Sequence, residues 1–199
     1  MKSYTRVNRI LHSMFASLMV LQLIDEEFMK RPKLVDGVPR MRTGQESFLF
    51  DLHEWVGMLL LIIVFLRLMM LLGNPEETKR LFPFLSAERM KGVLADLKEI
   101  PGWFVGRIKP PTEDDHLAGF VHGLGLLLGL ALGLTGTAMF VGMDPITGAM
   151  DEVVRSFKEI HELLGGLLLY YVIGHVAMAL VHQIKGHRSL QRISPLSRE

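Results

Sequence analysis

Two histidines on one long apolar segment are the residues best placed to do chemistry. His161 and His175 lie fourteen residues apart within HELLGGLLLYYVIGHVAMALVH. On an α-helix, fourteen residues advance roughly 21 Å and turn nearly four times, so both imidazoles leave one face about 40° apart. A bilayer core is about 30 Å thick, so one histidine would sit near each leaflet. Polar side chains at this depth are costly and usually functional, and imidazole is a common ligand of haem iron, which predicts two stacked metal centres.

Four stretches of the chain are apolar enough to cross a membrane and would position these histidines. They cover about residues 10–28, 52–72, 117–141 and 160–183. We therefore expect an all-α integral membrane four-helix bundle, with residues 1–199 as one domain. Most lysines and arginines fall in the two termini and the 73–115 loop, so the positive-inside rule places both termini in the cytoplasm, at a bacterial inner (plasma) membrane. No A-x-A-like site follows the first apolar run, so we expect an uncleaved span.

The inner loop and the overall composition narrow the class of protein. In the 73–115 loop, LSAERMKGVLADLKEI has apolar residues at helical spacing, which predicts a short amphipathic helix on the membrane surface; the alternative is a solvated linker. The net charge of +1, with no basic face, excludes a nucleic-acid partner. The lack of cysteine excludes disulfides, iron–sulfur ligation, thiol catalysis and covalent c-type haem. Any redox centre must then be held non-covalently by histidine.

The remaining spans supply a partner for each of the two histidines. With the orientation above, His12 lies near the inner end of the first span and His53 at the outer end of the second. Depth therefore pairs His53 with His161 outside and His12 with His175 inside, and each pair could clamp one haem between two helices. The alternatives are interfacial histidines without a metal, and zinc, whose sites usually gather three or four ligands in one place.

Further polar residues fall at the inner level. Arg67 follows the second-span histidine by the same fourteen residues, so it is predicted to pair with the propionates of the inner haem, the alternative being an arginine that reaches the headgroups. His116, His122 and Asp115 open the third span and are predicted to contact a quinone; the alternative is a polar helix start. His182, on the same stripe as His175 but at the membrane edge, could be a spare ligand, a propionate partner or an interfacial residue.

Glycines are placed where close approach would be needed. Gly57 and Gly165 each lie one turn past a predicted outer ligand, where a porphyrin comes close to backbone. Gly125, Gly129 and Gly133 have the small-xxx-small spacing that lets helices pack tightly, and helix packing is the role we expect for them.

These residues resemble those of a known family. KEIHELLGGLLLYYVIGHVAMALVHQIKGHRSL resembles the last span of the bacterial cytochrome b561 and Ni–Fe-hydrogenase b-type cytochrome superfamily, which includes the cytochrome b subunits of formate dehydrogenases and thiosulfate reductases. RVNRILHSM resembles its first span and LHEWVGMLLLIIVFLRL its second, with Arg67 at the position of the family's arginine. The resemblance implies His12 and His175 as ligands of the inner haem iron and His53 and His161 as ligands of the outer one. The third span matches poorly at its polar positions.

The function that follows is electron transfer across the membrane. We expect a subunit with two non-covalent haem b groups that links a quinone (menaquinone or ubiquinone) to a periplasmic partner, with no catalytic residue of its own identified. The resemblance implies as partner a hydrogenase, a formate or thiosulfate oxidoreductase, or a multihaem cytochrome c. Membrane lipid surrounds the chain, and a homodimer is left open.

Two other functions compete with this one. A stand-alone superoxide:quinone oxidoreductase would need a basic funnel over the outer haem, and the outer loop carries Lys30, Arg31, Lys33, Arg40 and Arg42. A haem-free membrane transporter or assembly protein would show no b-type absorption band.

Overall fold

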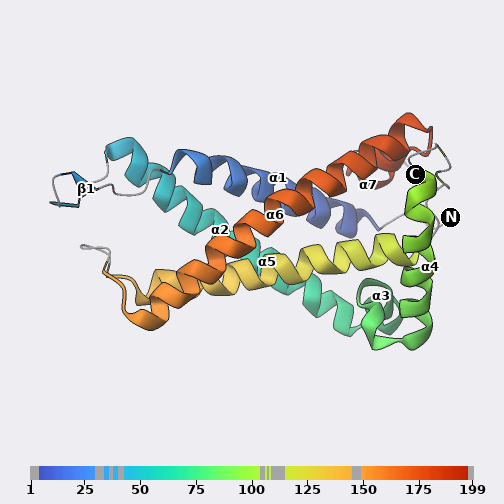
Figure 1. The fold of residues 1–199 in the computed structure, drawn as a ribbon, viewed down its shortest axis with the longest axis horizontal. Coiled ribbons are helices and arrows are strands. Elements are labelled where there is room, and N and C mark those ends of the chain that lie inside the picture. Colours follow the sequence, from blue (N-terminus) through green and yellow to red (C-terminus); the bar gives the residue numbers. More distant parts are fainter. Residues whose placement is uncertain are drawn as a thin grey trace.

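The computed structural model describes residues 5–29, 34–35, 38–39, 43–103, 106, 108, 115–144 and 149–196. Four of its helices are long and apolar enough to span a membrane, which confirms the predicted all-α architecture with four spans. They are α1 (Arg6–Phe28), α2 (Gly44–Leu72), α5 (His116–Gly142) and α6 (Glu152–Ile184). Figure 1 shows them running along the long axis of the molecule, with α6 crossing over the others. The basic residues on which the superoxide alternative depends lie outside the described residues: Lys30, Arg31, Lys33, Arg40 and Arg42.

The second and fourth spans begin about eight residues before their apolar segments. Thr43 and Glu46 form a capping box, in which the threonine oxygen accepts from the Glu46 N–H and the carboxylate accepts from the Thr43 N–H. Asp151 accepts from the Val154 N–H at the start of α6. These caps satisfy N–H groups that a helix leaves open, so the polar turns before each apolar run are helical too.

The long helices pack in sequence, α1 along α2, α2 along α5 and α5 along α6. α6 also reaches α1 and α2 through side chains, since Leu168 is buried with Met19 and Leu60. The α5 glycines allow the close contacts: a Cβ on Gly129 would lie 2.9 Å from Phe15 and one on Gly133 would lie 2.8 Å from Leu61. Their predicted packing role is therefore confirmed.

Short elements close the end of the bundle that is predicted to be the inner one. The predicted amphipathic helix is present as α4 (Ala87–Trp103), which packs across the start of α5 (Figure 1). Asp96 on α4 accepts from the Leu117 N–H. The segment after α7 (Ser189–Ile193) meets the first helix, since Arg9 Nη1 donates to the Ser194 carbonyl oxygen at 3.5 Å. Both ends of the described chain thus lie at one end of the bundle. The short elements are α3 (Pro75–Leu81), the 3₁₀ helix η1 (Pro83–Leu85), α4 (Ala87–Trp103), α7 (Ser189–Ile193) and the antiparallel pair β1 (Leu34–Val35) and β2 (Val38–Pro39).

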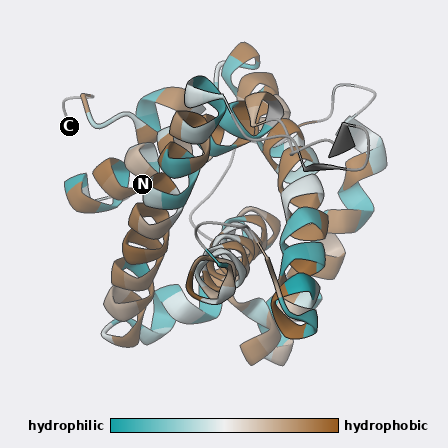
Figure 2. Cartoon of the chain, turned by 90° about the vertical axis from the view of Figure 1, so that its left-hand side faces the viewer, coloured by the Kyte–Doolittle hydropathy of each residue, from teal (hydrophilic) through white to brown (hydrophobic). Residues whose placement is uncertain are grey.

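Large apolar side chains face outward along the spanning helices. Trp55 on α2 is 67% exposed and Tyr170 on α6 is 75% exposed. Figure 2, a view along the long axis, shows hydrophobic residues on the outer as well as the inner sides of these helices. In water such surface would be costly, so it is surface for lipid.

Candidate metal centres

The outer pair of histidines brings α2 and α6 together. The rings of His53 on α2 and His161 on α6 have centroids 6.2 Å apart. Behind His53, the Asp25 carboxylate lies 2.9 Å from Nδ1 and is almost fully buried. Gln22 donates to the His53 carbonyl oxygen at 2.8 Å, which fixes α1 against α2 at this level.

The hydrogen bonds at the outer pair assign the ring tautomers. A carboxylate only accepts, so Nδ1 of His53 carries the hydrogen and Nε2 keeps its lone pair. Thr135 lies 2.9 Å from Nδ1 of His161, and its hydroxyl donates to the Ala131 carbonyl oxygen at 2.8 Å. The threonine oxygen therefore accepts from His161, which also leaves Nε2 of that ring as a free base. A hydrogen-bonded Nδ1–H is the usual support behind a metal-bound imidazole.

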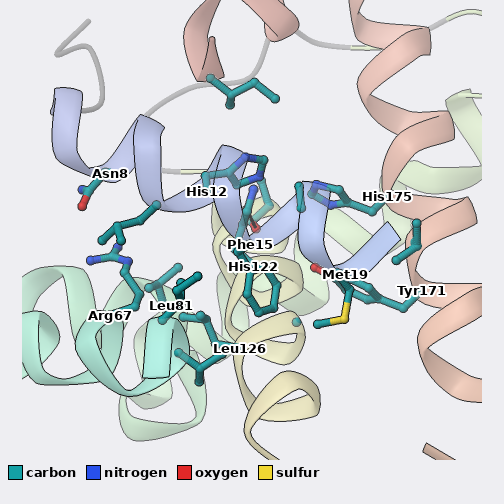
Figure 3. Close-up of a pocket in the computed structure, with 18 of the residues that line it drawn as sticks. Asn8, His12, Phe15, Met19, Arg67, Leu81, His122, Leu126, Tyr171 and His175 are labelled. Carbon is teal, nitrogen blue, oxygen red and sulfur yellow. Dashed lines mark hydrogen bonds between the residues drawn. The ribbon is translucent and has the colours of Figure 1, made fainter. Parts of the chain in front are cut away.

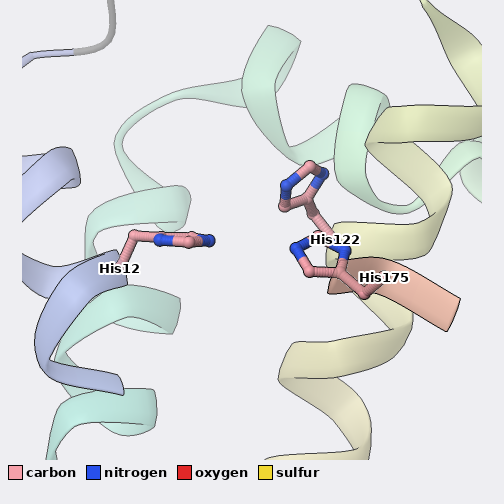
Figure 4. Close-up of side chains that lie close together, drawn as sticks. All are labelled: His12, His122 and His175. Atoms are coloured by element: carbon pink, nitrogen blue, oxygen red, sulfur yellow. The ribbon is translucent and has the colours of Figure 1, made fainter. Parts of the chain in front are cut away.

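The inner level gathers three histidines instead of two. The centroid of His12 on α1 lies 6.3 Å from that of His175 on α6 and 6.2 Å from that of His122 on α5. Figure 4 shows the His12 ring on one side, with the other two rings together opposite it. One nitrogen from each ring lies within 4.8 Å of the other two, the type of cluster that could hold a metal ion. Zinc sites usually gather three or four ligands in one place, so the inner level could also hold zinc.

Both pairs have the separation that one metal ion requires. A metal–imidazole bond is about 2 Å long and the ring centroid lies about 1 Å behind the nitrogen, so two rings on opposite sides of an ion have centroids about 6 Å apart. The His53–His161 and His12–His175 distances of 6.2 and 6.3 Å agree with this value. Along α6 the two centres are fourteen residues, or about 21 Å, apart.

A cavity of about 200 Å³ lies beside the inner histidines. Voids in packed protein seldom exceed one water molecule, so an opening of this size is a binding space. Figure 3 shows His12, His122, His175 and Tyr171 at one end of it and Asn8 and Arg67 at the other.

Three arginines line the far end of the cavity: Arg9, Arg67 and Arg80. Glu77 pairs with Arg67 at 2.6 Å and with Arg80 at 3.5 Å. Nη1 of Arg67 is buried and has no hydrogen-bond partner among the described residues, so this nitrogen is available to an acceptor in the cavity. An anionic acceptor fits beside a guanidinium group.

The glycines beside the outer histidines are less crowded than those of α5. A Cβ on Gly57 would be in ordinary van der Waals contact with the Gln22 side chain at 3.9 Å, and one on Gly165 with the Glu26 side chain at 3.8 Å. Close helix packing therefore does not require these two glycines, each one turn past a ring of the outer pair. At the inner level, the gathered histidine nitrogens and the unpartnered Arg67 nitrogen fit an anionic, metal-containing group such as haem.

The structure does not bring together the three residues predicted to contact a quinone. Asp115 caps α5 by accepting from the Ala118 N–H, which is the polar helix start considered above, although it also lines the cavity. His116 turns toward α4, where its ring would clash with a Cβ on Gly92, and it lines a separate polar pocket. His122 lies in the inner cluster.

His182 pairs with a residue to which the sequence assigned no role. Its Nδ1 lies 2.9 Å from Nδ1 of His187, which folds back after the turn that ends α6. His182 is not among the residues that line the cavity.

Four residues of these centres were not predicted from the sequence. Asp25 ends the first apolar run, so it looks like the boundary of a span, yet α1 carries it to the depth of His53. Thr135 lies thirteen residues after His122 on α5, an interval that would have placed it at the outer level. Arg9 and Arg80 flank the spans, and their positions in the sequence do not distinguish them from other interfacial cations.

Comparison with known proteins identifies one matching family. The family model described as prokaryotic cytochrome b561 matches residues 3–195, nearly the whole chain. No curated protein and no solved structure matches.

Proposed function

The chain belongs to the prokaryotic cytochrome b561 family, and on that premise we propose that it carries two haem b groups and transfers electrons across the bacterial inner membrane. Membership makes it a multi-pass membrane protein with haem b as the implied cofactor. The observation that carries the proposal of two haems is the pair of histidine couples at 6.2 and 6.3 Å, which share α6 and lie fourteen residues apart on it.

Each couple would hold one haem iron. His53 and His161 are the ligands of the outer haem, and His12 and His175 those of the inner haem. Bound in this way, haem b supplies a one-electron carrier with no open position for substrate. The chain's own residues would therefore hold the iron, orient the rings and exclude water rather than bind a reactant at the metal.

The propionates of the inner haem would be held by the arginine end of the cavity. Arg67 offers its unpartnered Nη1, and Arg9 and Arg80 add positive charge beside it. Arg67 would then have the role predicted for it, together with Arg9 and Arg80.

The inner haem would exchange electrons with a quinone and the outer one with a periplasmic partner. Of the predicted quinone contacts, Asp115 and His122 line the inner cavity, whereas His116 faces α4. Both termini would face the cytoplasm, in line with the basic inner loops. The partner would be a hydrogenase, a formate or thiosulfate oxidoreductase, or a multihaem cytochrome c, as the resemblance to the dehydrogenase subunits implies.

Two observations bear on the alternatives. A divalent cation is the competing occupant of the inner level, because three histidine nitrogens gather there. The outer level, with one ring on each side, fits haem better. A haem-free transporter is disfavoured by the family membership.

Haem content after single substitutions tests the ligand assignment. We expect His53→Ala and His161→Ala each to remove the outer haem and keep the inner one, and His12→Ala to do the reverse. His116→Ala is the matched control, since that histidine faces α4, and it should keep both haems. A purified wild-type protein with no b-type α-band, or His53→Ala and His161→Ala variants that retain both haems, would overturn the proposal.

The direction of the electron path can be tested in sealed vesicles. With the inner face outward, added quinol should reduce the haems, and an impermeant oxidant inside the vesicle should reoxidise them. Reduction by quinol that needs neither Asp115 nor His122 would exclude these residues from the quinone contact.

A further inference from the structure

We propose that His122 is a second iron ligand on the His175 side of the inner haem, so that His12 can be paired with either of two histidines. The inference rests on the proposed function, because it concerns the coordination of the inner haem. It gives His122 a role at the metal itself, in addition to the quinone contact expected from its position on the third span.

His122 and His175 lie equally far from His12. Their ring centroids lie 6.2 and 6.3 Å from that of His12, both near the separation of about 6 Å expected for two imidazoles on opposite sides of an ion. The two rings are only 5.1 Å from each other, so they share one side (Figure 4). An ion bonded to His12 would thus face both.

The hydrogen bonds favour His122 at least as much as His175. Nδ1 of His122 lies 2.6 Å from the Ala118 carbonyl oxygen, which can only accept, so the hydrogen is on Nδ1 and Nε2 is a free base. This is the backbone support that metal-bound histidines usually have. Neither ring nitrogen of His175 has a hydrogen bond among the described residues, and its ring rests on Tyr171, stacked at 5.7 Å.

The helix that carries His122 is held firmly on both sides. Toward α3, a Cβ on Gly119 would lie 2.5 Å from the Arg80 carbonyl oxygen, and one on Gly123 would collide with the Leu81 backbone. Toward α6, the Tyr171 hydroxyl donates to the Val121 carbonyl oxygen at 3.1 Å. These contacts fix the depth and rotation of α5 at His122, so the ring is held near the ion by the fold itself.

The outer level provides an internal control. Among the described residues, no third histidine joins His53 and His161, and Thr135 and Asp25 only accept hydrogen bonds from the two rings. His161→Ala therefore removes a ligand that no other histidine can replace. His175→Ala removes a ligand that His122 can replace. The two substitutions make the same chemical change on the same helix.

Haem stoichiometry and spin state of the purified full-length variants test the inference. We expect two haems in His122→Ala and two in His175→Ala, with the inner haem still six-coordinate and low-spin. We expect a single haem in His161→Ala and in the double variant His122→Ala/His175→Ala. His175→Ala should also shift the midpoint potential of the inner haem, because the second ligand has changed.

Two results would overturn the inference. One is a His175→Ala protein with a single haem, like His161→Ala; the other is an inner haem that is retained but high-spin. The outer haem reports correct folding in each variant, and if His175→Ala holds neither haem, His175→Asn replaces it in the same comparison. A wild-type chain without haem would refute the proposed function. A wild-type chain with two haems, together with a His175→Ala variant that has lost the inner haem, would refute only the role of His122 as a second ligand.

Discussion

Asp25 is the buried carboxylate behind the outer histidine pair, and Asp25→Asn isolates the effect of its charge. The asparagine can still accept from Nδ1 of His53 through its Oδ1 atom, so the geometry is kept while the negative charge is lost. A negative charge near the iron stabilises the oxidised form. Its removal should therefore raise the midpoint potential of the outer haem.

The size of the shift follows from the distances. The Asp25 oxygen lies 2.9 Å from Nδ1 of His53, and the midpoint between the two rings is half of their 6.2 Å separation beyond the His53 centroid. The charge is then about 7 Å from that midpoint, and at an effective dielectric constant of about 20 it contributes about 2 kcal/mol, equivalent to about 100 mV.

Redox titration of the purified variants, followed at the b-type α-band, measures this shift. We expect the outer component to rise by about 100 mV in Asp25→Asn and the inner component by no more than about 35 mV, since its ligands are about 21 Å away along α6. Asp51→Asn is the matched control, with the same charge lost from an exposed position on α2 at the outer end. An unchanged outer potential in Asp25→Asn, or an equal shift in Asp51→Asn, would refute the reasoning.

Two further predictions concern glycines on either side of the bundle. Gly133→Ala places a Cβ against a leucine of α2 at 2.8 Å and should destabilise the fold by about 1–3 kcal/mol. The control Gly174→Ala adds a Cβ in open space and should be neutral or slightly stabilising. Thermal unfolding in detergent compares the two variants, and equal melting temperatures would contradict the packing described. Gly165→Leu places a large side chain one turn from His161 and should remove the outer haem, whereas Gly166→Leu, on the exposed side of α6, should keep both, as haem-to-chain ratios would reveal. Retention of both haems in Gly165→Leu would mean that no flat group lies there.

The spans and the pairing of histidines by depth were accessible from the sequence for simple physical reasons. Hydropathy marks the segments that lipid must surround, and the fixed rise per residue of a helix converts spacing into depth. His12 could therefore be matched with His175, and His53 with His161, from their spacing alone, and these rings do lie together. Whether they hold iron is a separate question, which the haem measurements address.

The rotation of helices about their own axes was not accessible in this way. Depth put His122 at the inner level, but only the packing of α5 against α3 and α6 turns its ring toward His12. His116, six residues earlier, is turned toward α4 by the same rotation, which separates it from the cavity.

Contacts made where the chain folds back on itself could not be predicted from the sequence either. Arg67 pairs with Glu77 because Asn74 caps α3 and turns the chain back against the end of α2. The helical turns that precede the apolar part of α2 depend on the Thr43 cap, a local signal that hydropathy does not contain.

The ratio of haem to chain in the purified wild-type protein tests the central claim most directly. Haem measured as its pyridine complex, protein measured by amino-acid analysis and metals measured by mass spectrometry give that ratio in one preparation. We expect two haem b groups per chain, matched by two iron atoms and no stoichiometric zinc or copper. A haem-free chain with one divalent cation, or a chain with a single haem, would contradict the two-centre arrangement.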